Sequence, residues 1–297
     1  MNNQNIPGKV IDFSALQRKR LQEQYREKAA SPTRIVSITS GKGGVGKTTF
    51  AINLGFAMSK MGKRVLILDA DLGLGNLDVL LGLTPRYNLS HVIRGEKKIE
   101  EVIACYPDNI KILSSSSGIQ EMTDLSKEQS FRLISEIDSS LRDIDILLID
   151  TAAGISPNVT YFNTTAQEIL VIVVPEPASI TDAYALMKVL SMRFHNKYFK
   201  ILINFAESIR EAQEVFRQLR IVSDRFLDIS LEYFGCVLAD ENITKAIKQQ
   251  QILVQEYPES TAAKCYHALA KKFIGSHPHF YHRKSSGSVW KHFRQEL

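Results

Sequence analysis

Short runs of apolar residues recur along the chain from Arg34 onward, and longer mixed stretches separate most of them. Each run has the length and the continuous apolar character of a strand that is buried on both faces of a parallel sheet. The runs are RIVSIT, RVLILD, NIKILS, IDILLID, EILVIVV, FKILIN and LEYFGCV. The pattern therefore predicts seven strands in one sheet.

The stretches between these runs are long enough for helices. We expect helices over residues 47–61, 126–142, 178–193, 208–226, 241–250 and 257–274. Alternation of strands and helices on this scale favours an α/β fold, in which a doubly wound, mostly parallel sheet carries helices on both faces.

The two ends of the chain lack this alternation, which divides the chain into three predicted parts. Residues 1–33 form an N-terminal arm, residues 34–275 the α/β domain, and residues 276–297 a basic linker with a C-terminal helix. The arm contains IDFSALQRKRLQEQYREK, a helix whose apolar residues are too widely spread for a core stripe. We interpret it as a helix that orders on a partner, and a frayed N-terminus is the alternative.

The C-terminal segment VWKHFRQEL is amphipathic when it is drawn as a helix. Its apolar residues fall within one arc of about 100°, and they are Val289, Trp290, Phe293 and Leu297. An apolar face with Trp and Phe beside basic residues is typical of a helix that lies on a membrane surface. We therefore predict membrane targeting, and a helix docked on the body of the protein is the alternative.

The composition is ordinary except near the C-terminus, where positive charge is concentrated. The 297 residues are 44% hydrophobic and 23% charged, as in ordinary globular proteins. The net charge is +5, and the seven Lys or Arg and one Glu from Lys264 to Leu297 give +6, which leaves the rest of the chain at 5 − 6 = −1. This tail indicates an anionic partner such as a membrane surface or a nucleic acid, unless it only aids solubility.

Several classes of protein are disfavoured by what the sequence lacks. The cysteines, Cys105, Cys236 and Cys265, form no CxxC pair, which argues against a disulfide framework and against a zinc or iron–sulfur site. No run reaches the roughly 18 apolar residues of a membrane span, and no secretory signal is visible. We expect a cytoplasmic protein that associates peripherally with the inner face of the cell membrane.

A glycine-rich loop lies between the first predicted strand and the first predicted helix, where residues 41–48 match G-x-x-x-x-G-K-T. Glycines let successive backbone N–H groups converge on phosphate, and a helix N-terminus favours an anion. Lys47 is expected to reach the β- and γ-phosphates, and Thr48 to ligate Mg²⁺. The predicted ligands are ATP or ADP and Mg²⁺, bound by Gly41, Lys42, Gly43, Gly44, Val45, Gly46, Lys47, Thr48 and Thr49.

Acidic residues follow two further predicted strands, at the edge of the sheet where ligands bind in open α/β folds. Asp69 ends the second strand, Asp71 lies just beyond it, and Asp150 ends IDILLID. Asp71 is well placed to orient an attacking water, and Asp150 to bind Mg²⁺ through water. The predicted metal set is Thr48, Asp69 and Asp150, and glycines in both following loops predict nucleotide-sensing switches.

The loop GKGGVGKTT contains a second lysine, Lys42, that a generic phosphate loop does not need. It resembles the deviant Walker A motif of the MinD/ParA superfamily of P-loop ATPases, in which the extra lysine reaches across a nucleotide-sandwich dimer. The resemblance implies a MinD-like fold, a homodimer with ATP, and slow hydrolysis that dimerisation or partners stimulate. The implied catalytic residues are Lys42, Lys47 and Asp71. Lys42 would add positive charge at the transferring phosphoryl group only in the dimer.

Two further segments, PEPASITDAYALMKVL and YPESTAAKCYHALAKKF, resemble the FlhG family of flagellar number and placement regulators, also called FleN or YlxH. The resemblance covers about residues 34–274. It implies that Asn204 contacts the adenine and that Asp240 lies in the rest of the base pocket, although Leu238 stands where relatives often have proline. The implied partners are the GTPase FlhF, flagellar basal-body components, an anionic membrane surface and, as a further candidate, a flagellar transcription regulator.

The arm departs from this family. Many members carry a DQAxxLR motif that activates FlhF, whereas this chain has DFSALQR over residues 12–18. The Asp and the Arg are kept, and the Gln and the Ala are replaced. The resemblance therefore implies docking on FlhF and leaves stimulation of its GTPase activity open.

Other functions stay open at this point. A MinD-type division-site regulator is disfavoured by the arm and by the PEPASITDAY segment. A ParA-type DNA-partition ATPase needs basic residues spread over the dimer surface rather than gathered in one tail, so nucleic acid is not the expected partner. An iron–sulfur carrier is disfavoured because no CxxC pair occurs, and a scaffold that binds ATP without hydrolysis has no support, since all the residues implied for hydrolysis are present.

Overall fold

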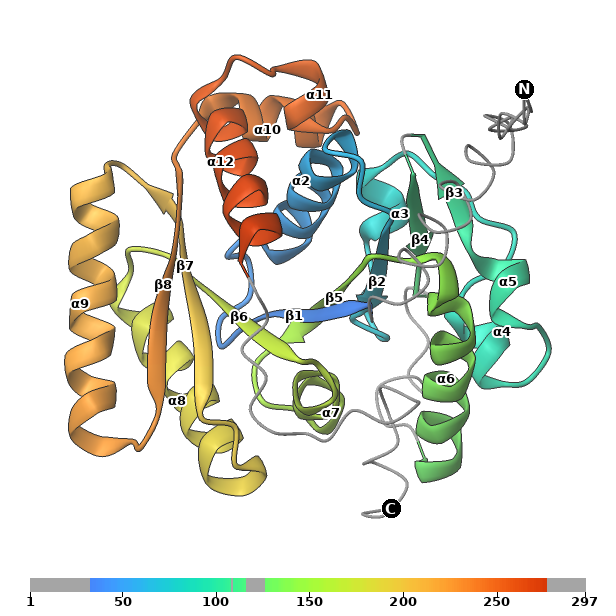
Figure 1. Ribbon diagram of the computed structural model, residues 1–297, viewed down its shortest axis with the longest axis horizontal. Coiled ribbons are helices and arrows are strands. Elements are labelled where there is room, and N and C mark those ends of the chain that lie inside the picture. The colour runs from blue at the N-terminus through green and yellow to red at the C-terminus, as the bar shows by residue number, and fades with distance from the viewer. Residues whose placement is uncertain (1–32, 108, 116–125, 277–297) are drawn as a thin grey trace, which may run out of the picture. The chain divides into compact units, whose positions relative to one another are not determined.

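The computed structural model describes residues 33–107, 109–115 and 126–276, and all structural statements below concern this part of the chain (Figure 1). Its strands form one sheet in the order β3-β4-β2-β5-β1-β6-β7-β8. Their bounds are β1 Arg34–Ser40, β2 Val65–Ala70, β3 Ala104–Tyr106, β4 Ile110–Leu113, β5 Ile146–Ala153, β6 Glu168–Val173, β7 Tyr198–Ala206 and β8 Ser230–Leu238.

All seven predicted strands occur, and neighbouring pairs among them are parallel. The sequence pattern missed β3, which pairs antiparallel with β4 at one edge of the sheet. Its three residues are too few to give a recognisable apolar run. The α/β class with a mostly parallel sheet is therefore confirmed.

The six predicted helices also occur, with ends that differ by a few residues. They are α2 Lys47–Lys60, α6 Lys127–Ser140, α8 Pro177–Phe194, α9 Ile209–Phe226, α10 Glu241–Lys248 and α12 Thr261–Gly275. The largest difference is at α12, which begins four residues later than predicted. Ser260 fixes this start, because its hydroxyl accepts a hydrogen bond from the N–H of Ala263 at 3.2 Å, as an N-cap does.

Shorter helices were not predicted. They are α3 Leu77–Leu80, α4 Leu89–Ile93, α5 Ile99–Val102, α7 Pro157–Thr165 and α11 Leu253–Glu256, with a 3₁₀ turn at Leu141–Asp143. The sequence of α7, PNVTYFNTT, is rich in threonine and asparagine, which favour helices weakly. Ser156 as N-cap and Pro157 in the first turn set its start, a signal that the apolar pattern does not contain.

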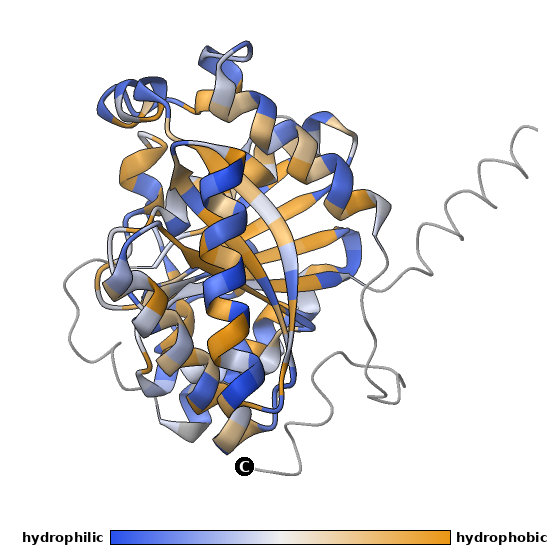
Figure 2. Ribbon diagram, turned by 90° about the vertical axis from the view of Figure 1, so that its left-hand side faces the viewer, coloured by the Kyte–Doolittle hydropathy of each residue, from blue (hydrophilic) through white to orange (hydrophobic). Residues whose placement is uncertain are grey.

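Helices cover both faces of the sheet, as predicted (Figure 1). Val36 and Ile38 of β1 point to one face, where they belong to the same apolar cluster as α2 and α12. Ile35 points to the other face, where the residues of α4, α5 and α6 gather, and α8 and α9 cover β6 and β7. Figure 2 shows hydrophobic colour concentrated in the strands, while α9, facing the viewer, carries many hydrophilic residues.

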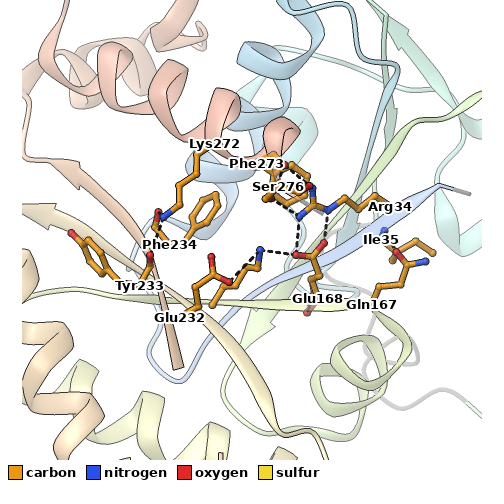
Figure 3. Close-up of polar contacts among 12 residues, drawn as sticks. Arg34, Ile35, Gln167, Glu168, Glu232, Tyr233, Phe234, Lys272, Phe273 and Ser276 are labelled. Carbon is orange, nitrogen blue, oxygen red and sulfur yellow. Dashed lines mark hydrogen bonds and ion pairs between the residues drawn. The ribbon is translucent and has the colours of Figure 1, made fainter. Parts of the chain in front are cut away.

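A buried cluster of charges joins the amino ends of the central strands to the end of α12 (Figure 3). Glu168 of β6 accepts two hydrogen bonds from Arg34 of β1, that from Nη2 at 2.9 Å, and forms an ion pair with Lys200 of β7 at 2.8 Å. Arg34 also donates to the carbonyl oxygens of Phe273 at 2.6 Å and Ser276 at 3.0 Å. Burial would raise the pKa of Glu168, but Arg34 and Lys200 hold it below its ordinary value. This cluster fixes the last turn of α12 on the sheet.

Candidate active site

The loop between β1 and α2 ends on Gly46, which caps the N-terminus of α2 in a left-handed conformation with φ of 85°. An L side chain there would be strained, and its Cβ would lie 2.6 Å from Asn204 Nδ2. Within the described chain, no side chain caps α2 and its first turn holds no acidic residue. The first N–H groups of α2 are therefore left for an external anion such as phosphate.

The start of the loop is packed just as closely. A Cβ on Gly41 would lie 2.2 Å from the backbone carbonyl group of Asp182 in α8, so only glycine fits. The Ser40 hydroxyl donates to the backbone oxygen of Lys42 at 2.7 Å and accepts a hydrogen bond from Lys47 Nζ at 3.0 Å. These contacts within the chain hold the predicted phosphate-binding loop in place.

Lys47 and Thr48, at the start of α2, lie close to Asp150 at the end of β5 and to Asp71 just beyond β2. Burial lowers the pKa of Lys47, and the charges of Asp150 and Asp71 partly offset this. The side chain of Thr48 forms a hydrogen bond with Asp150. The structure therefore brings these four predicted site residues together at the carboxyl edge of the sheet.

Asp150 and Asp69 lie opposite one another on the adjacent strands β5 and β2. Asp150 is 2% exposed, and its Oδ1 has no hydrogen-bond partner among the described residues. Burial, and then the nearby Asp69, raise the pKa of Asp150 to about 8. A buried carboxyl oxygen without a partner, beside a threonine hydroxyl, fits a magnesium ion, which takes one or two protein oxygens besides water and phosphate.

The Asp69 carboxylate organises the loop that follows β2. It accepts backbone N–H groups from Asp71 at 3.1 Å, Asn76 at 3.1 Å and Leu77 at 3.2 Å. Burial raises the pKa of Asp69 to about 6 despite these bonds. Sequence analysis predicted Asp69 only as a metal ligand, and that role stays a prediction. Its role in holding the loop was missed, because backbone donors carry no sequence signal.

Asp71, the predicted water-orienting residue, is half-buried in the same loop. Its Oδ1 accepts the N–H of Leu74 at 3.1 Å, and its backbone oxygen accepts the hydroxyl of Ser115 at 2.9 Å. Ser115 follows β4, and it is a site residue that sequence reasoning missed. A Cβ on Gly75 would lie 1.7 Å from Ser115 Oγ, so this glycine allows the close approach.

Asn204 and Asp240 were expected around the adenine. The Asn204 amide donates to the Val45 carbonyl at 2.8 Å, while its buried Oδ1 has no partner among the described residues. That oxygen can accept a hydrogen bond from an amino group such as that of adenine. Asp240 instead accepts the N–H groups of Asn242 at 2.9 Å and Ala262 at 3.0 Å, which joins α10 to α12. Its contact with a base stays a prediction.

Comparison with known proteins agrees with this geometry. Residues 31–274 match the ParA family model, which is described as NUBPL iron-transfer P-loop NTPase. The chain is 43% identical over 241 residues to the antiactivator FleN of Pseudomonas aeruginosa, covering 81% of this chain and 86% of FleN. This chain belongs to the ParA family. It is a P-loop ATPase of the MinD/ParA group, as the second lysine predicted.

Other relatives of this ParA-family ATPase support the same placement. The flagellum site-determining protein YlxH of Helicobacter pylori is 28% identical, over 74% of this chain and 75% of YlxH. The septum site-determining protein MinD of Pyrococcus horikoshii, solved in complex with Mg-ADP, superposes with a TM-score of 0.68 at 27% identity. That comparison covers 82% of this chain and 96% of MinD.

The family description names iron transfer, and iron–sulfur clusters are held in proteins mainly by cysteine thiolates. The three cysteines of this ParA-family chain are free, and none pairs with another in a CxxC motif. Among the residues that the structure describes, no group of three or more His, Cys, Asp or Glu side chains is arranged to hold a metal ion. A magnesium ion bound mainly by phosphate and water does not need such a group.

Some predictions lie outside the described residues. These are the helix of the arm and the membrane-binding side chains Val289, Trp290, Phe293 and Leu297. Within residues 33–107, 109–115 and 126–276, the structure contains no helix that is both long and apolar enough to cross a membrane.

Proposed function

We propose that the chain is an Mg-ATP-dependent dimerising switch that regulates the number or placement of flagella at the inner face of the cell membrane. The observation that carries this proposal is the site itself. Among residues 33–107, 109–115 and 126–276, no side chain caps the N-terminus of α2 and none bonds the buried Oδ1 of Asp150, and a loop with two lysines lies between β1 and α2. The higher identity to FleN than to MinD favours a flagellar role over a division-site role.

Each residue has one task in the proposed reaction. Lys47 and the N–H groups at the start of α2 would hold the phosphates, and Thr48 and Asp150 would hold Mg²⁺, which would neutralise phosphate charge. Asp71 orients the attacking water. Lys42 extends to the nucleotide of a second copy, so that hydrolysis depends on dimerisation.

The two terminal segments would bind the protein partner and the membrane. Residues 1–33 would dock a partner such as an FlhF-type GTPase or a basal-body component, with residues 34–275 as the ATPase domain and residues 276–297 as the membrane-binding tail. A helix as short as VWKHFRQEL binds a bilayer weakly. Two such helices in a dimer bind far more tightly through their effective concentration, so ATP would switch membrane attachment.

Removing residues 285–297 is expected to abolish ATP-dependent binding to anionic vesicles. The test is co-sedimentation with phosphatidylglycerol-containing vesicles in the presence of Mg-ATP or Mg-ADP. The full chain should sediment with vesicles in ATP and much less in ADP, and the truncated chain in neither. Equal sedimentation with and without the tail would remove the membrane step from the proposal.

A further inference from the structure

Lys42 has an ion-pair partner within its own chain. Its ammonium group contacts the carboxylate of Glu176, the residue that precedes α8. The side chains are 35% and 56% exposed, so the pair lies at the surface of the described chain. The two residues are 134 positions apart in sequence, and the fold brings them together because β6 lies next to β1 in the sheet.

The backbones on both sides of this pair are fixed. The hydroxyl of Ser40 binds the backbone oxygen of Lys42, and Gly41 packs directly against the backbone of α8. The N–H of Glu176 donates to the carbonyl of Val174 at 2.7 Å, and Pro177 follows at the first position of α8. Only the two side chains are therefore free to separate, and the flexible lysine stem is the longer of them.

We infer that Glu176 retains Lys42 within its own chain and thereby opposes ATP-dependent dimerisation. This inference rests on the proposed function, in which Lys42 reaches the nucleotide of the partner. A lysine that is paired with its own carboxylate must break that contact before it binds a phosphate elsewhere. Glu176 thus weakens the association of two chains, because its carboxylate competes with the phosphates of the partner's bound ATP for Lys42.

The size of the effect follows from the exposure of the pair. Exposed ion pairs change an equilibrium by about 1.4- to 5-fold each. Each dimer breaks two such pairs, one in each chain, so the two factors multiply. Glu176 is therefore expected to raise the dimer dissociation constant by about 2- to 25-fold.

The Glu176→Gln variant tests this directly in the full-length chain. We expect its dimer dissociation constant, measured by sedimentation velocity with Mg²⁺ and a non-hydrolysable ATP analogue, to fall by about 2- to 25-fold. The matched control is Glu101→Gln, which breaks the exposed pair between Glu101 of α5 and Lys97, two residues before that helix, with Lys97 28% and Glu101 48% exposed. That control should dimerise like the wild type.

The Lys42→Ala variant separates failure of this inference from failure of the proposed function. If Lys42→Ala leaves dimerisation and the dimer-stimulated rate unchanged, Lys42 has no role in the partner's site and the proposed function loses its trans lysine. If Lys42→Ala abolishes that rate while Glu176→Gln dimerises like or more weakly than the wild type, only the role of Glu176 is overturned. A weaker Glu176→Gln dimer would mean that Glu176 supports the assembled state instead.

Discussion

Replacing Asp71 with alanine is expected to slow ATP hydrolysis by about 10²- to 10⁴-fold, the usual contribution of a residue that positions or deprotonates a nucleophile. Asp71 lies just beyond the end of β2, and its charge acts on Lys47. Nucleotide binding should persist, because the loop from Gly41 to Thr48 is untouched. The ATP-bound dimer should therefore accumulate, which single-turnover hydrolysis and sedimentation velocity would show together.

Asp78 provides the matched control for this substitution. It lies in the first turn of α3, and its carboxylate also accepts a backbone N–H, that of Val79 at 2.8 Å. Asp78→Ala therefore removes a similar local contact from the same region without removing a strand-end carboxylate. It should hydrolyse ATP at close to the wild-type rate. Wild-type turnover in Asp71→Ala would remove Asp71 from the reaction.

Glu168→Ala is expected to lower the free energy of unfolding by about 3 kcal/mol, at the low end of the range for breaking a buried ion pair. Lys200, whose side chain is 3% exposed, would lose its partner at 2.8 Å. Glu232, at 3.6 Å from Lys200, compensates part of that charge. Urea unfolding should show the loss, while Glu259→Ala, which breaks an exposed pair with Lys264, should cost less than about 1 kcal/mol.

The pH dependence of stability provides a second measurement on Glu168. Its pKa is lower in the folded chain than its ordinary value of 4.5. The ionised Glu168 carboxylate therefore stabilises the folded chain above pH 4.5. This stabilisation is lost as the pH falls through the pKa that Glu168 has in the folded chain. The wild type should therefore lose more stability than Glu168→Ala on acidification below pH 4.5. If the free energy of unfolding changed with pH in the same way for both proteins, the lowered pKa of Glu168 would be contradicted.

Much of the fold could be predicted because its strands are buried on both faces. Continuous apolar runs such as EILVIVV leave little ambiguity, whereas the helix starts after Ser156 and Ser260 were missed because they depend on capping hydroxyls that the apolar pattern does not contain. The antiparallel strand β3 could not be predicted, since three residues carry no pattern. Short helices such as α3 and α11 depend on tertiary packing more than on their own sequence.

The site was predictable where one motif spans consecutive residues, as from Gly41 to Thr48. It was not predictable where distant segments meet. Ser115 reaches the backbone of Asp71 across 44 positions, and Glu176 reaches Lys42 across 134. Such contacts depend on the order of strands in the sheet, which neither periodicity nor a local motif determines.

Calorimetric titration of the full-length chain with ATP in the presence of Mg²⁺ tests the central claim most directly. We expect the wild type to bind one nucleotide per chain saturably, and Lys47→Ala to lose this binding, because it lacks the ammonium group that would hold the phosphates. Absence of any binding of ATP or ADP by the wild type would contradict it, because the switch would then have no trigger.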